Sequence, residues 1–236
     1  MQINSASNET YKDLQKLNQK KYRDIKNLYL IFGDDLILEA KKNQLIVKYL
    51  NCENEDSIFL SDKLMLSLQE GTSFTRGAIV KKDTKNIDCP KILVLNGVGD
   101  PTNVGSLLRS AAAFGFEKIV CDNNTADYYN TKTVRVSKGA IFYLSLTRCD
   151  LVSYLNEKRK EGYIIVGADA HSNNTAVTPI NKVCLVLGSE GLGLSTEVKE
   201  ICDSLVCIKT NYVESLNVSV AGSIIMHYIN LGGLPK

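Results

Sequence analysis

The second half of the chain alternates short, fully apolar segments with helical ones, and this alternation restricts the possible folds more than any other feature. Residues 91–98, 164–169 and 183–188 each contain a continuous apolar run (92–95, 164–168 and 183–188), which is typical of strands buried on both faces of a parallel sheet. Between them, residues 104–116 and 153–163 have the spacing of amphipathic helices. The pattern predicts an α/β fold.

The first part of the chain has the same alternation on a smaller scale. Residues 28–80 contain four short apolar segments with helical segments among them, which predicts a small α/β unit. The stretch from Lys81 to Lys91 is polar and contains Pro90, so it is a candidate linker. We therefore predict two domains, residues 1–85 and residues 90–236.

Residues 1–28 are predicted to be helical and basic. The apolar side chains of Tyr11, Leu14 and Leu17 recur at helical spacing and mark a buried side. The strip of cations comprises Lys12, Lys16, Lys20, Lys21, Arg23 and Lys26. Two interpretations stay open: a solvated helix face, or a surface that contacts phosphates.

Composition excludes several classes of function. The 28 basic and 26 acidic residues nearly cancel, so any surface for nucleic acid has to be local. The seven cysteines form no C-x-x-C motif and the two histidines are far apart, which predicts no metal site and no disulfide framework. The chain starts without a signal-like segment and contains no apolar run of the ~20 residues that span a bilayer. We predict a cytoplasmic protein without a membrane association.

Three segments carry polar side chains inside apolar surroundings. The first, DPTNVGSLLRSAAAFGF (residues 100–116), predicts a helix with Arg109 beside Thr102 and Ser106, away from the buried face. An arginine on the surface of an amphipathic helix is the ordinary interpretation. The second, LVLGSEGLGLS (residues 185–195), is a strand that ends in a glycine loop. Its G-x-x-G-x-G spacing differs from the dinucleotide fingerprint, and a tight turn explains it equally well.

The third segment, CIKTNYVESLNVSVAGSI (residues 207–224), predicts a strand, a loop and a helix. The helix from residue 216 to 231 is apolar on nearly every side, which predicts burial in a core or against another subunit. Ser215 and Asn217 precede it and are ordinary helix-capping residues. Buried polar groups cost roughly 1–3 kcal/mol each unless they find partners, so these side chains need an explanation.

In this order and at these intervals, the three segments closely resemble the motifs of the SpoU (TrmH) family of RNA 2′-O-methyltransferases. The resemblance covers residues 90–231, and residues 1–85 resemble more weakly that family's substrate-binding domain, which is similar to ribosomal protein L30e. It implies an α/β domain with a deep trefoil knot, S-adenosylmethionine as cofactor and a homodimer. It also implies methylation of a ribose 2′-hydroxyl in structured RNA, most specifically ribosomal RNA.

The resemblance also assigns the site residues. The polar positions of the family's catalytic site correspond to Arg109, Asn103, Glu190, Ser215 and Asn217, and the cofactor positions to Leu187, Gly188, Ile208 and Leu216. Arg109 would lie at the target ribose. Because a guanidinium stays protonated near neutral pH, we expect Arg109 to position a phosphate and stabilise the developing alkoxide. Proton removal by Arg109 is the second option.

One departure from the family pattern concerns the cofactor loop. Where many members have Ile-Pro-Met, this chain has Ile208-Lys209-Thr210, so a fixed backbone angle is lost and a charge is gained. We expect cofactor binding to survive, because Ile208 keeps its apolar side chain. Alternatives are a transfer-RNA or base methyltransferase of the same fold, and an RNA-binding member without turnover. A nicotinamide oxidoreductase is disfavoured by the glycine spacing.

Overall fold

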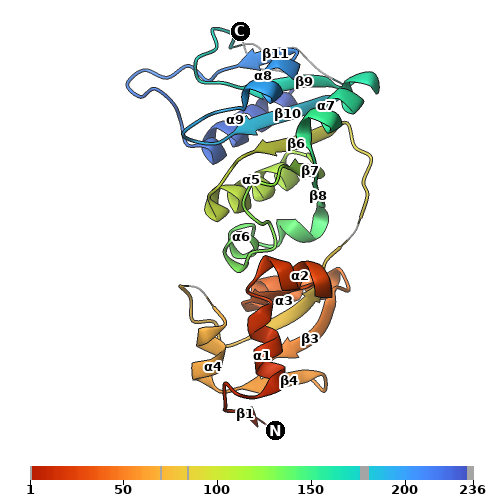
Figure 1. Ribbon diagram of the computed structural model, residues 1–236, viewed down its shortest axis with the longest axis vertical. Helices are drawn as coiled ribbons and strands as arrows, with labels where there is room; N and C mark the ends of the chain where they lie inside the picture. The colour runs from red at the N-terminus through yellow and green to blue at the C-terminus, as the bar shows by residue number, and fades with distance from the viewer. Residues whose placement is uncertain (1, 70, 84, 176–180, 233–236) are drawn as a thin grey trace. The chain divides into compact units, whose positions relative to one another are not determined.

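The computed structural model of the chain describes residues 2–69, 71–83, 85–175 and 181–232 (Figure 1). Its contacts divide the protein into two compact units. Unit 1 comprises Met1–Asp83 and Asp127–Phe142, and unit 2 comprises Thr84–Ala126 and Tyr143–Lys236. Residues 127–142 therefore pack with unit 1, although the sequence analysis placed them within the second predicted domain.

Unit 1 is built on a mixed five-stranded sheet in the order β1-β4-β3-β5-β2. β1, β4 and β3 are parallel, whereas β5 runs antiparallel to β3 and to β2. The strands are β1 (Gln2–Ile3), β2 (Leu28–Phe32), β3 (Ile46–Leu50), β4 (Ser57–Leu60) and β5 (Gly77–Lys81). The helices are α1 (Glu9–Lys16), α2 (Lys20–Lys26), α3 (Asp34–Lys42), α4 (Asp62–Ser67) and α6 (Thr131–Val136), followed by the 3-10 helix η1 (Ala140–Tyr143).

The basic strip of residues 12–26 is largely neutralised by its own neighbours. Lys12 pairs with Glu9 at 2.7 Å, Lys16 with Asp13 at 2.8 Å, and Lys20 with Asp24 at 3.2 Å. Lys26 also reaches Asp13, at 3.1 Å. The strip therefore has less net charge than its lysine count suggests.

Arg23 departs furthest from the predicted strip, because it is buried. Its side chain is 4% exposed and pairs with Asp127, with an Nη2 to Oδ2 distance of 2.6 Å. Its Nη1 donates to the backbone carbonyl of Leu17 at 2.7 Å. Counting Arg23 among the exposed cations of this helix was wrong, because a partner far along the chain compensates its burial.

Unit 2 contains a six-stranded sheet in which every neighbouring pair is parallel, in the order β11-β9-β10-β6-β7-β8. The strands are β6 (Lys91–Asn96), β7 (Lys118–Cys121), β8 (Ser145–Arg148), β9 (Ile164–Ala168), β10 (Val183–Gly188) and β11 (Ser204–Val206). β6 and β10 lie at the centre and are almost entirely buried, as fully apolar strands require. The predicted α/β fold with a parallel sheet is confirmed.

Two pairs of helices cover this sheet. α5 (Pro101–Ala113) packs against α9 (Val218–Asn230), and α7 (Leu151–Lys160) packs against α8 (Thr196–Ile201). Gly222 of α9 permits the close approach on the α5 side, because a Cβ there would lie 2.4 Å from Leu187 Cδ1 and 2.7 Å from Leu107 Cδ2. α9 therefore lies directly on the C-terminal end of β10, where the glycine loop begins.

The predicted burial of the C-terminal helix on all sides holds only in part. Gly222, Ile225, Met226 and Ile229 are buried, but Val220 is 48% exposed. Asn217 caps the helix by accepting the N–H of Ser219 at 2.9 Å, which is the capping role the sequence allowed. No helix in the described part of the chain combines the length and apolar character needed to cross a bilayer.

Candidate functional site

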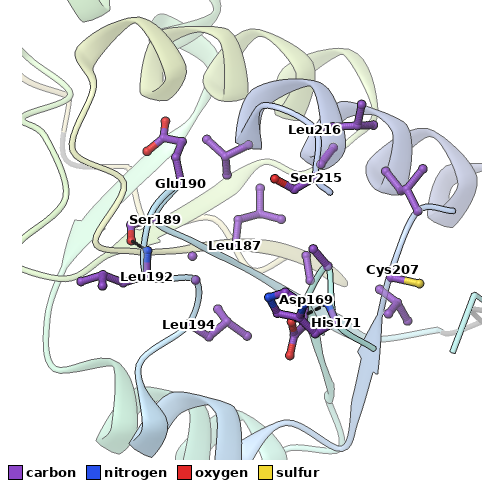
Figure 2. Close-up of a pocket in the computed structure, with 18 of the residues that line it drawn as sticks. Asp169, His171, Leu187, Ser189, Glu190, Leu192, Leu194, Cys207, Ser215 and Leu216 are labelled. Carbon is purple, nitrogen blue, oxygen red and sulfur yellow. Dashed lines mark hydrogen bonds between the residues drawn. The ribbon is translucent and has the colours of Figure 1, made fainter. Parts of the chain in front are cut away.

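A pocket of about 310 Å³ opens where β9, β10 and β11 end (Figure 2). Ligands of open parallel sheets bind at the carboxyl ends of the strands, because the connecting loops converge there. The apolar lining includes Leu187, Leu216 and Ile225, and the glycine loop from Ser189 to Leu194 forms one wall. The volume falls in the range typical of small-molecule sites.

The glycine loop folds back on the end of β10. Ser189 and Gly193 exchange backbone hydrogen bonds of 3.1 and 3.0 Å, so the loop closes on itself. Gly188 has no room for a side chain, because a Cβ would lie 2.2 Å from the carbonyl carbon of Gly193. Gly193 has a φ of +68°, which glycine adopts without strain. The glycines therefore shape the pocket wall.

Three predicted site residues form one hydrogen-bonded chain beside the pocket. Asn103 of α5 is 8% exposed and donates from Nδ2 to Oε1 of Glu190. Its Oδ1 accepts from Nδ2 of Asn217 at 3.1 Å. Each of the three residues comes from a different predicted motif, so the fold brings together segments that are far apart in the sequence.

Most of the predicted site residues line the pocket itself. Gly188, Glu190 and Ile208 line it. Ser215 lines it too, yet its side chain is exposed, so the predicted burial of this hydroxyl is wrong. Figure 2 shows Ser215 and Leu216 together at the start of the α9 segment, across the pocket from Leu194.

Three of the predicted site residues, Asn103, Asn217 and Arg109, do not line the pocket, and Arg109 is the one outside the hydrogen-bonded chain as well. It is exposed on α5, two turns after Asn103, while Ser110 bonds to Ser223 of α9 at 2.7 Å. The same helix thus contributes the buried Asn103 to a network with the exposed Glu190 and Asn217, and presents a guanidinium to solvent on another face. Such a group is available to a partner that approaches from outside the chain.

Sequence reasoning missed a polar cluster at the end of β9. Asp169, His171 and Lys199 line the pocket, and Lys199 Nζ lies 2.5 Å from Asp169 Oδ2. Figure 2 shows Asp169 and Glu190 on different sides of Leu187. The signal in the sequence was Asp169, which directly follows an apolar segment. This signal cannot be interpreted until the order of the strands in the sheet is known.

Thiols and carboxylates show no second reactive centre. All seven cysteines are free, and burial raises the pKa of Cys184 to about 12. Across the described ranges, no three His, Cys, Asp or Glu side chains are grouped to hold a metal ion.

Comparison with known proteins identifies relatives over the whole chain. The model of the family described as "SpoU rRNA Methylase family" matches residues 90–227. A 23S rRNA (guanosine(2553)-2′-O)-methyltransferase from Bacillus subtilis, RlmP, is 32% identical over 97% of this chain and 98% of its own length. A 23S rRNA (guanosine-2′-O-)-methyltransferase from Ralstonia nicotianae, RlmB, is 35% identical over 57% of this chain and 56% of its own length.

Solved structures support the same assignment at the level of the fold. The SpoU methyltransferase AviRb from Streptomyces viridochromogenes, crystallised with the cofactor AdoMet, superposes with a TM-score of 0.83 over 95% of this chain and 97% of its own. An AdoMet-bound rRNA methyltransferase from Sinorhizobium meliloti gives 0.83 over 98% and 97%. Both are 22% identical in sequence, so they establish the fold alone.

Proposed function

Because the chain belongs to the SpoU rRNA methylase family, we propose that it transfers a methyl group from S-adenosylmethionine to a ribose 2′-hydroxyl of ribosomal RNA. The observation that carries this proposal is the chain of hydrogen bonds through Asn103, which joins Glu190 and Asn217 beside a pocket at the strand ends. All three predicted motifs therefore contribute to one place. An RNA-binding protein without turnover would have no need to keep this network.

The pocket residues fit a nucleoside cofactor. Leu187, Leu216 and Ile225 offer apolar surface to an adenine ring, and Gly191 and Gly193 leave the loop wall free of side chains there. Ile208 lines the pocket, so the neighbouring Lys209-Thr210 does not remove the apolar contact that the family site needs. When bound, S-adenosylmethionine supplies a methyl group activated by its sulfonium.

The chain's own residues hold the reactants and stabilise charge. The Glu190–Asn103–Asn217 network fixes the glycine loop relative to α5 and α9, which limits the freedom of anything held in the pocket. Arg109 binds a phosphate of the target RNA and stabilises the alkoxide that forms as the hydroxyl loses its proton. Its exposure leaves it free to meet RNA, and its permanent charge makes it a poor base.

We further propose that the C-terminal unit is knotted and that two copies form a homodimer. Exposed apolar side chains near the pocket and on α9 support a partner surface, since Leu192 is 93% exposed, Val220 48% and Leu231 67%. Size-exclusion chromatography with light scattering tests the dimer, and a monomer at micromolar concentration would contradict it.

Unit 1, comprising residues 1–83 and 127–142, is proposed to be the L30e-like domain that selects the RNA. The name of the Bacillus relative favours 23S ribosomal RNA over transfer RNA as substrate. Exposed lysines of α1 and α2 would contribute modestly, because acids already pair with most of them. We place the protein in the cytoplasm, where its substrate would be assembled.

One experiment separates these proposals. Total RNA from cells with and without the protein is mapped for 2′-O-methyl groups, and the purified protein is incubated with ribosomal RNA, transfer RNA and labelled S-adenosylmethionine. A protein-dependent methyl group in ribosomal RNA supports the proposal, whereas one in transfer RNA or on a base would redirect the substrate. No methyl transfer to any RNA, together with tight RNA binding, would favour an inactive member.

A further inference from the structure

Asp169, His171 and Lys199 form a hydrogen-bonded cluster at the end of β9, and the proposed mechanism assigns it no role. Asp169 follows Ala168, the last residue of β9, and its side chain is 13% exposed. Oδ1 accepts the backbone N–H of His171 at 3.0 Å, and Oδ2 accepts from Lys199 Nζ at 2.5 Å. Both Asp169 and Lys199 line the pocket together with Leu187 and Gly188.

The helix that carries Lys199 is held close to β9. Gly167 of β9 allows this approach, because a Cβ there would lie 2.8 Å from Cys202 Sγ and 2.8 Å from Leu194 Cδ1. At its far end, Asp203 accepts the N–H of Ile165 at 2.8 Å. The position of Lys199 beside Asp169 is therefore fixed by packing along α8.

Asp169 is held as a carboxylate. Burial opposes its charged form, but the hydrogen bonds from Lys199 and from the N–H of His171 outweigh this and lower the pKa of Asp169. Each carboxylate oxygen has a second lone pair, so two further donors can bind. Glu214 is a further acidic neighbour of His171, and its Oε1 lies 3.9 Å from His171 Nε2 in an exposed contact.

Resting on the proposed function, we propose that Asp169 positions the cofactor by accepting hydrogen bonds from its ribose hydroxyls, and that Lys199 holds Asp169 in place. An acidic side chain at the end of a parallel strand is well suited to a vicinal diol, as in dinucleotide sites of other folds. The ammonium of the cofactor's amino-acid part is a poorer candidate, because Lys199 already places a cation on Oδ2.

The test measures ligand discrimination by calorimetry with the full-length protein. The probes are S-adenosylhomocysteine, its 2′,3′-dideoxy analogue and 5′-methylthioadenosine. We expect the unmodified protein to bind S-adenosylhomocysteine about 10- to 100-fold more tightly than the dideoxy analogue, which is the range for hydrogen bonds to a charged group. Asp169→Asn should weaken S-adenosylhomocysteine about 10-fold or more and leave the dideoxy analogue nearly unchanged.

Two variants serve as controls. Glu200→Gln removes an exposed carboxylate of α8 that does not line the pocket, so discrimination should persist. Lys199→Gln should reduce discrimination by about 2- to 10-fold, less than Asp169→Asn, because it frees the carboxylate without removing it. Since discrimination is a ratio within one protein preparation, partial unfolding does not mimic it.

The outcomes separate this inference from its premise. If Asp169→Asn weakens both ligands equally, or leaves the ratio intact, Asp169 is structural and the inference is wrong. If Asp169→Asn weakens the binding of S-adenosylhomocysteine but not that of 5′-methylthioadenosine, which keeps the ribose hydroxyls, the carboxylate contacts the amino-acid part of the ligand. That outcome also contradicts the inference. If the unmodified protein binds none of the three probes, the proposed cofactor itself is wrong and the inference falls with it.

Discussion

The polar network of unit 2 and the basic strip of unit 1 contrast in how far their partners lie along the chain. Asn103 bonds to Glu190 and Asn217, which are 87 and 114 positions away. Lys12, Lys16 and Lys20 of α1 and α2 pair with acids three or four positions away, and Lys26 pairs with Asp13 of the neighbouring helix. Only the first arrangement requires the whole fold, so only it makes a site that no isolated segment contains.

Unit 1 also contains pairs of the long-range kind, and among those described the pair of Arg23 with Asp127 is the most deeply buried. The two residues are 104 positions apart, and the arginine is almost fully buried. A buried charge that loses its partner is far more costly than an exposed one. The difference between buried and exposed pairs in the same unit can therefore be measured directly.

The largest expected effect on stability comes from Asp127→Ala. It leaves the buried guanidinium of Arg23 with the carbonyl of Leu17 as its remaining described partner, and should lower the free energy of unfolding by about 3–5 kcal/mol. Urea denaturation measures this, and tyrosine fluorescence reports on it because the chain has no tryptophan and Tyr29 stacks near Tyr129. A loss below about 1 kcal/mol would place this pair with the exposed ones.

The next effect concerns catalysis. Arg109→Ala should lower the methyl-transfer rate about 100- to 1000-fold, the range for removing one group that stabilises a developing oxyanion. Affinity for S-adenosylhomocysteine should stay within about twofold, since Arg109 does not line the pocket. Lys160→Ala, an exposed cation on α7, is the matched control and should leave the rate unchanged. Full activity of the Arg109 variant would remove this residue from the proposed mechanism.

Much of the fold was predictable because its signals are local. The apolar segments that became β6, β9 and β10 are long enough to be read without knowing their neighbours. β8 (Ser145–Arg148) and α6 (Thr131–Val136) were missed, because a four-residue strand and a helix rich in β-branched residues carry weak local patterns. The Asn130 cap of α6 is a local contact. The contacts of α6 with β2 also hold the helix, and only the tertiary structure provides these.

The site was predictable only where a motif marked it. The pairing of Asn103 with Glu190 and Asn217 was not derivable from spacing, although their shared resemblance to one family placed them in one site. Asp169 and Lys199 lie outside the motifs, and their proximity depends on the order β9-β10 in the sheet and on the packing of α8. Burial of Arg23 was equally hidden, since its partner lies 104 positions away.

A smaller effect is expected when the network of unit 2 is broken at its centre. Asn103→Ala removes the shared partner of Glu190 and Asn217, which are exposed and can bond to water instead, and should cost about 0.5–1.5 kcal/mol of unfolding free energy. Asn103→Asp should be worse than Asn103→Ala, because it sets a second carboxylate beside Glu190. The variants are compared by urea denaturation, with exposed Asn123→Ala as control. If the Asp variant is as stable as the Ala variant, Glu190 does not face this position.

The smallest effect is expected for the exposed pairs of unit 1. Lys16→Gln should leave the unfolding free energy nearly unchanged at neutral pH, because both partners are largely solvated. Hydrogen bonds from Lys16 and Lys26 lower the pKa of Asp13 below its ordinary value of 3.8, so the stabilisation it contributes is present above that value and is lost as the pH falls through the lowered pKa. Lys16→Gln should therefore slightly reduce the loss of unfolding free energy that occurs as the pH falls. Unfolding curves collected between about pH 5 and pH 2 measure this. A large loss at pH 7 would mean that the strip is structural, and the contrast between local and long-range pairs would not hold.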